Sequence, residues 1–336
     1  MAPDSASAAP PLSTPVAFFV FNRPALTRQV LARLREARPT RLFVIADGPR
    51  PKITGEALVC EEVRTLVLQG IDWPCQVLTL FSPTNLGCGP RLYSGLQWLF
   101  QHVEEAIILE DDCLPHPTFF RFCAEMLAEY RDHPAIFMVA GTHFGGAQPD
   151  QANRCLFTRH CSVWGWATWR RAIANYSLDM SWWRREVQPR DIRRECADGR
   201  EYRFICDLFD APRHGAVNTW DIQWFAHVFR HRGFSVVPGT NLVSNLGITG
   251  QHTTKSATRH HLASGAAQFP IVPPPKIERD RDYERLLVHQ HRPPGGWFLG
   301  HYLTRLVHGP CGPVLRHAWR RCRMAVNALH QANSQA

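Results

Sequence analysis

Short apolar runs and longer amphipathic stretches alternate through the first half of the chain. Residues 15–21 and 41–46 are continuous apolar runs of strand length, and the apolar positions between them recur at helical spacing. The same pattern predicts helices over residues 56–69, 90–102 and 118–132 and strands over residues 76–81, 106–109 and 136–140. Apolar strands that alternate with amphipathic helices indicate an α/β fold with a mostly parallel sheet covered by helices on both faces.

Polar residues follow the predicted strands. Asn22 and Asp47 end the first two strands, and Asn85 follows the third. Asn22 is also suited to cap the helix that starts near Pro24. In such sheets ligands bind beyond the carboxyl ends of the strands, so these residues are expected to border one cleft.

The composition and the hydrophobic pattern of the sequence change after about residue 156. Tryptophans crowd into some 60 residues and the strand–helix alternation is lost, which predicts a second lobe built over the cleft. We therefore expect a disordered tail over residues 1–14 and one domain over residues 15–269, with halves at 15–145 and 146–269. Residues 270–336 are predicted to form a proline-rich linker and a basic helical tail that contacts a membrane surface peripherally.

Composition narrows the class of protein. The net charge of +9 comes almost entirely from arginine, which suits phosphate contacts but also fits a general compositional bias. Basic runs interleaved with aromatics on a nucleic-acid module are not found, so nucleic acid is not an expected partner. The eleven cysteines show no CxxC spacing and are expected to be free thiols. Residues 1–15 do not read as a signal peptide, and an apolar run of membrane-spanning length is not found, which predicts a cytoplasmic protein.

Three consecutive acids, Glu110, Asp111 and Asp112, follow the apolar strand over residues 106–109. Adjacent carboxylates repel one another, and a hard divalent cation with oxygen ligands relieves that repulsion. Mn²⁺ or Mg²⁺ is therefore the expected cofactor. The alternative is that Asp112 caps a helix beginning near His116.

These motifs resemble the GT-A-fold glycosyltransferases, which use nucleotide-diphosphate sugars. The acidic triplet is similar to their DxD-type motif and to the Glu-Asp-Asp of N-acetylglucosaminyltransferase I. The chain is more similar to a bacterial family-2-like group known as hemolytic proteins, over roughly residues 15–254. The matching segments are Phe-Asn-Arg-Pro at 21–24, Asn-Leu-Gly at 85–87, Glu-Asp-Asp at 110–112, the tryptophan box at 163–169, Trp-Asp at 220–221 and Gly-Ile-Thr-Gly-Gln-His at 247–252.

The resemblance implies a set of donor-binding residues. Arg23 would meet a phosphate, Asp47 the base or ribose, and Glu110 and Asp111 would assist Asp112. One ring of the tryptophan box would face the sugar while the others pack in the core. The implied donor-site residues are Asn22, Arg23, Asp47, Asn85, Arg91, Glu110, Asp111, Trp164 and Trp166.

The resemblance also implies a catalytic base and a late metal ligand. Asp221 would deprotonate an acceptor hydroxyl, and His252 would join Asp112 and Asp111 at the metal. The alternative for Asp221 is an N-cap of the helix that follows it.

The expected function is an inverting, metal-dependent transfer of a hexosyl or N-acetylhexosaminyl group to a surface glycan or a lipid-linked sugar. Two alternatives stay open, a non-catalytic nucleotide-sugar-binding module and a nucleotidyltransferase on the same sheet. The latter lacks its expected glycine-rich phosphate loop, because Phe-Asn-Arg-Pro follows the first strand instead.

Overall fold

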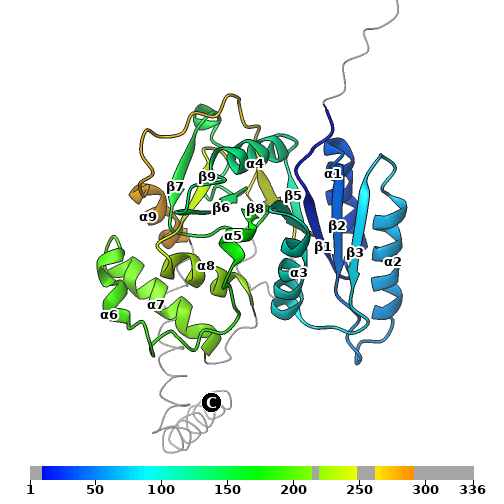
Figure 1. Ribbon diagram of the computed structural model, residues 1–336, viewed down its shortest axis with the longest axis horizontal. Helices are drawn as coiled ribbons and strands as arrows, with labels where there is room; N and C mark the ends of the chain where they lie inside the picture. The colour runs from blue at the N-terminus through cyan, green and yellow to red at the C-terminus, as the bar shows by residue number, and fades with distance from the viewer. Residues whose placement is uncertain (1–9, 214–218, 248–261, 291–336) are drawn as a thin grey trace, which may run out of the picture. The chain divides into compact units, whose positions relative to one another are not determined.

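One mixed sheet of eight strands forms the centre of the molecule (Figure 1). A computed structural model describes residues 10–213, 219–247 and 262–290, which belong to a unit that ends at Gln290. The spatial order of the strands is β3 (Gln76–Phe81), β2 (Arg41–Ala46), β1 (Val16–Val20), β4 (Glu105–Glu110), β8 (Trp166–Trp169), β6 (Ile136–Ala140), β9 (Phe234–Pro238) and β7 (Cys155–Thr158).

Most neighbouring strands of this sheet run parallel. In the β3–β2–β1–β4 half every pair is parallel, and in β1 Phe18 stands opposite Val44 of β2 and Leu109 of β4. β8 pairs antiparallel with both β4 and β6, and β7 pairs antiparallel with β9. The predicted mostly parallel α/β sheet is confirmed.

Helices cover both faces of the sheet. The α-helices of the described residues are α1 (Pro24–Ala37), α2 (Glu56–Gln69), α3 (Cys88–His102), α4 (Thr118–Glu129), α5 (Arg170–Ile173), α6 (Pro189–Ile192), α7 (Gly199–Arg213), α8 (Asp221–Arg230) and α9 (Arg281–Gln290). Alternate residues of β1 enter different cores. Phe18 packs with side chains of α1, α2 and α4, and Phe19 packs with those of α3 and α8. Gly95 of α3 permits this contact, since a Cβ there would lie 2.5 Å from the Phe19 ring.

The second lobe is built on its own apolar cluster. α7 and α8 lie side by side in this lobe (Figure 1). Their side chains and Trp183 form a third apolar cluster. Trp183, Trp224 and Trp166 are among the largest fully buried side chains. Most of the tryptophan crowding therefore serves packing.

Ordered residues lie on both sides of the predicted domain over residues 15–269. Leu12 exchanges backbone hydrogen bonds with Ala37 and Thr40, so residues 10–14 are ordered against α1 and β2. At the other end, Val272 forms a β-bridge with Arg154, and α9 buries Tyr283 and other side chains against the sheet and second lobe. The unit therefore continues past the predicted end at residue 269 to Gln290.

The predicted basic helix over residues 297–329 lies outside the described residues. Among the helices that the structure does describe, none has the length and apolar character needed to cross a membrane.

Candidate functional site

The acidic triplet stands at the junction between the main sheet and a small two-stranded sheet. Glu110 is the last residue of β4, and β5 (Cys113–Pro115) starts directly after Asp112. α4 begins later, at Thr118, with Pro117 at its N-cap position and no side-chain cap. The alternative that Asp112 caps this helix is therefore wrong.

Arg23 binds two of the three acids. Its Nη1 donates to Asp111 Oδ1 at 3.2 Å and to Asp112 Oδ2 at 2.6 Å. Asp111 is buried and also accepts a hydrogen bond from the Phe21 amide at 3.2 Å, so it joins the end of β1 to the end of β4. Asp112 remains partly exposed.

Ionisation of all three acids of the triplet is unfavourable in the surroundings that the protein provides. Burial raises the pKa of Glu110 well above its usual range, and the charges of Asp112, Asp111 and Asp221 raise it further, while Arg23 opposes them. Burial also raises the pKa of Asp111 to about 7, against the opposing effect of Arg23. One guanidinium does not supply enough positive charge to stabilise three ionised carboxylates. An added cation would supply the rest.

A later segment of the chain, residues 243–247, returns to the triplet. β10 (Val243–Asn245) pairs antiparallel with β5, and the Leu246 amide donates to the Asp112 carbonyl at 2.7 Å. Gly247 lies so close that a Cβ there would be 2.3 Å from Asp112 Oδ2. A larger residue at this position would displace the Asp112 carboxylate. His252, the predicted late metal ligand, lies outside the described residues.

Asp47 organises the loop before α3. Its carboxylate accepts from the amides of Gly48, Leu86 and Gly87 at 2.8 to 3.1 Å and from Asn85 Nδ2 at 3.0 Å. Asp47 and Asn85 are thus brought together as predicted, but they bind each other. A donor contact by either residue stays a prediction.

Arg91 and Asn22 are also held by protein partners. Arg91 is buried and donates to the Leu80 carbonyl at 3.1 Å, and desolvation lowers its pKa. Asn22 donates to Glu56 Oε1 at 2.8 Å, and Arg23 occupies the N-cap of α1 without a side-chain cap. The expectation that Asn22 caps this helix is wrong, because Glu56 attracts its amide instead.

Asp221 lies at the start of α8 and is exposed. The N-cap is Trp220 and the helix has no side-chain cap, so the capping alternative for Asp221 is wrong. Its carboxylate accepts from the Thr219 hydroxyl. Its charge contributes to the raised pKa of Glu110, and its role as a base stays a prediction.

Cys88 is a residue near the triplet that the sequence did not single out. It starts α3, and its pKa is raised to about 12 by desolvation and by the charges of Glu110, Asp221 and Asp112. In the sequence, Cys88 lies between the matched segment 85–87 and Arg91, and no motif includes it.

The tryptophan box divides between core and half-buried positions. Trp166 is 1% exposed and packs against Trp220 and Trp224 with ring centroids 5.7 and 5.3 Å apart. No ring surface is left for a ligand, so the prediction that Trp166 binds the donor is wrong. Trp164 is half-buried against Phe144 and keeps the predicted role open.

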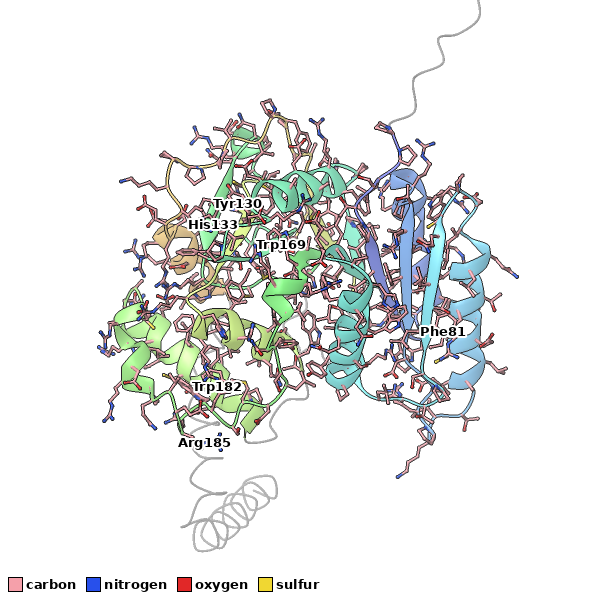
Figure 2. The ribbon with its side chains drawn as sticks, viewed as in Figure 1. Phe81, Tyr130, His133, Trp169, Trp182 and Arg185 are labelled. Carbon is pink, nitrogen blue, oxygen red and sulfur yellow. The ribbon has the colours of Figure 1, made fainter. Side chains whose placement is uncertain are left out.

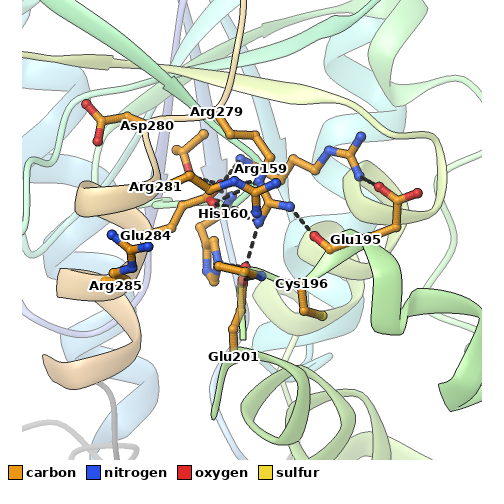
Figure 3. Close-up of polar contacts among 12 residues, drawn as sticks. Arg159, His160, Glu195, Cys196, Glu201, Arg279, Asp280, Arg281, Glu284 and Arg285 are labelled. Carbon is orange, nitrogen blue, oxygen red and sulfur yellow. Dashed lines mark hydrogen bonds and ion pairs between the residues drawn. The ribbon is translucent and has the colours of Figure 1, made fainter. Parts of the chain in front are cut away.

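A second group of potential metal ligands lies away from the triplet. His160, Glu201 and Glu284 bring ligand atoms within 4.8 Å of one another, the one such group among the residues that the structure describes. Arg279 already lies among them: Nη2 donates to Glu201 at 2.7 Å and Nε to Glu284 at 2.8 Å (Figure 3). The guanidinium supplies the compensating charge, so this cluster is a structural ion-pair network that ties α9 to α7.

Comparisons with known proteins find solved structures of similar fold but do not assign the chain to a family. No family model matches the sequence, and no curated protein matches it. Among solved structures, the chain is similar to the mannosyltransferase PcManGT from Pyrobaculum calidifontis in complex with GDP-Man and Mn²⁺, at 14% identity and a TM-score of 0.32. That match covers 50% of this chain and 48% of the mannosyltransferase, so the chain spans about half of that protein's length.

Two further solved structures match over more of the chain. The galactosyltransferase LgtC, in complex with donor and acceptor sugar analogues, is 12% identical over 85% of this chain and 99% of its own, with a TM-score of 0.33. A UDP-glucose pyrophosphorylase in complex with UDP-glucose is 8% identical over 70% and 94%, with a TM-score of 0.34. At these TM-scores the likenesses carry no inference about function, which has to come from the residues of the site.

Proposed function

We propose that the chain is a metal-dependent glycosyltransferase of the GT-A type. The observation that supports this most directly is the cluster of Glu110, Asp111 and Asp112 at the carboxyl end of β4, where Arg23 is ion-paired with two of these acids. Three carboxylates near one guanidinium favour a divalent cation and an anionic ligand over a purely structural role.

The residues present suit Mn²⁺ or Mg²⁺. Hard cations of this kind take carboxylate oxygens together with the phosphates of a substrate. Asp112, the partly exposed acid, would hold the ion with help from Asp111, and Arg23 marks the place where positive charge is accepted. When bound, the metal would offset the negative charge that develops on the leaving diphosphate.

Arg23 has a second role in this proposal. It is ion-paired with the acids, and its side chain is one-third exposed. A metal at Asp112 would release the guanidinium toward the donor diphosphate, which it can bind through two parallel hydrogen bonds. Asn22, Asp47, Asn85 and Trp164 would border the donor, as the motif resemblance implies.

Asp221 would act as the base of an inverting transfer. Its exposed carboxylate accepts a proton from an acceptor hydroxyl, whose oxygen then bonds to the anomeric carbon while the bond to the diphosphate breaks. The sugar class is hexosyl or N-acetylhexosaminyl, and the acceptor a surface glycan or lipid-linked sugar. The tail over residues 297–329 would bring the protein to the inner face of the membrane.

A thermal-shift screen of nucleotide sugars, with and without Mn²⁺, tests the proposal. A specific donor raises the melting temperature by mass action, and we expect a rise that requires the metal. Asp112→Asn should lose this rise while melting normally without ligand. If no nucleotide sugar stabilises the wild-type protein, or if Asp112→Asn keeps a chelator-sensitive rise, the proposal fails.

A further inference from the structure

Gln223 carries a buried amide oxygen without a partner. It lies in the first turn of α8, two residues after Asp221, and is 8% exposed. Its Oε1 is buried and makes no hydrogen bond within the described part of the chain. Nearly all buried polar groups in proteins are hydrogen-bonded. An unpaired amide oxygen is therefore unfavourable unless a ligand donates a hydrogen bond to it.

The amide borders a cavity of about 830 Å³. One wall is the start of α3 at Gly89 and Pro90, a second is the segment from Leu178 to Arg185, and Gln223 lies on a third with Thr219. The Thr219 hydroxyl also donates to the Asp221 carboxylate. The cavity therefore adjoins the proposed base.

The charged side chains around this cavity are already paired. Arg184 makes two hydrogen bonds of 2.6 Å to the buried Asp210, and Arg185 contacts Glu186 at 3.0 Å. Arg185 projects from the outer part of the second lobe, near Trp182 (Figure 2). Asp179 accepts from the amide and hydroxyl of Ser181 at 2.8 and 2.7 Å. Such a wall suits a neutral ligand better than a phosphate.

The wall is also held in shape before any ligand arrives. Arg184 adopts a left-handed backbone conformation with φ of 66°, which is unusual for a side chain of its kind. Its ion pair with Asp210, which also accepts from Trp183 Nε1 at 3.0 Å, holds this turn in place. Strained residues that neighbours hold in this way gather at binding sites.

We propose that this cavity binds the neutral, hydroxyl-rich sugar of the acceptor and that the Gln223 amide recognises one of its hydroxyls. An amide both donates and accepts, which complements a hydroxyl group that does the same. Gln223 thereby positions the acceptor beside Asp221. The inference rests on the proposed function, because it takes Asp221 as the base.

Gln223→Met tests this assignment in the full chain, since methionine keeps the length of the side chain and removes the amide. The probes are methyl glycosides of glucose, galactose, mannose and N-acetylglucosamine, followed by saturation-transfer NMR with Mg²⁺ and a nucleoside diphosphate. We expect at least one glycoside to bind the wild-type protein and its signal to fall at least about fivefold in Gln223→Met. The melting temperature should stay the same or rise, because an unpaired buried amide has been removed.

Gln290→Met is the matched control. The Gln290 amide donates to the Phe144 carbonyl at 2.8 Å, so its loss should lower the melting temperature and leave the glycoside signal intact. Equal glycoside signals in wild type and Gln223→Met, a marked loss of stability in Gln223→Met, or no glycoside bound by the wild type would each overturn the inference. Donor thermal shifts on the same samples separate the two proposals, since a metal-dependent shift that survives such a result leaves the proposed function standing.

Discussion

Asp221→Asn separates a catalytic carboxylate from a structural one. The substitution keeps the shape of the side chain and removes its ability to take a proton. Loss of a general base costs about a hundredfold or more in kcat, which corresponds to about 2.7 kcal/mol in the activation free energy. Donor affinity should hardly change, because a base acts in the chemical step.

The structure predicts that the same substitution lowers the free energy of unfolding only slightly. Asp221 is exposed, its carboxylate accepts a hydrogen bond from the Thr219 hydroxyl, and it provides no side-chain cap to α8. The loss is confined to a favourable charge at a helix N-terminus, about 0.3–1 kcal/mol. Because no cap is removed, Asp221→Ala is equally informative and should show the same loss of turnover.

The assay compares kcat, donor affinity and unfolding free energy in each variant, with the donor found by the thermal-shift screen. Asp282→Asn is the matched control, since Asp282 is also an exposed acid in the first turn of a helix, α9. Its turnover should equal that of the wild type. Near-normal turnover in Asp221→Asn would refute the role of this base, and Asp179 at the cavity wall would be the next candidate.

Three further outcomes are expected. Arg279→Met should lower the free energy of unfolding by about 3–5 kcal/mol in urea titrations, because it leaves two buried glutamates without their counter-charge, whereas Arg285→Met at an exposed pair should not. Burial lowers the pKa of His227 to about 4, so its protonation favours the unfolded chain and its stabilisation is lost as pH falls from about 6.5 toward 4. Relative to His227→Gln, the wild type should lose about 2 kcal/mol between pH 7.5 and pH 5, and a pH-independent difference would contradict this. Truncation after Pro294 should abolish weak, salt-sensitive binding to anionic vesicles, and equal binding by both proteins would refute membrane contact by the tail.

Local patterns were sufficient to predict the sheet and the position of the triplet. Strand-length apolar runs predicted β1, β2, β4 and β6 closely, because strands buried on both faces must be largely apolar. The edge strand β3 was predicted as well, although none of its residues is fully buried. Polar residues at their carboxyl ends were correctly expected on one edge. Both signals depend on neighbours in the sequence.

The features that could not be predicted depend on contacts between residues that are distant in the sequence. Asn22 looks like a cap until Glu56 is placed beside it, and Asp112 looks like a cap until β10 pairs with β5. The inclusion of α9 depends on Arg279 meeting two glutamates from separate helices. Contacts between residues that are distant in the sequence cannot be recognised from the hydrophobic pattern of the chain.

The place of β8 between β4 and β6 has a consequence for how the chain must be made. Both neighbours of β8 are synthesised before it, so a nascent chain carries two unpaired strand edges until β8 emerges from the ribosome. Unpaired edges are templates for pairing with other chains. A fragment that ended at residue 145 would keep these edges permanently, and we expect it to aggregate unless the missing part is produced together with it.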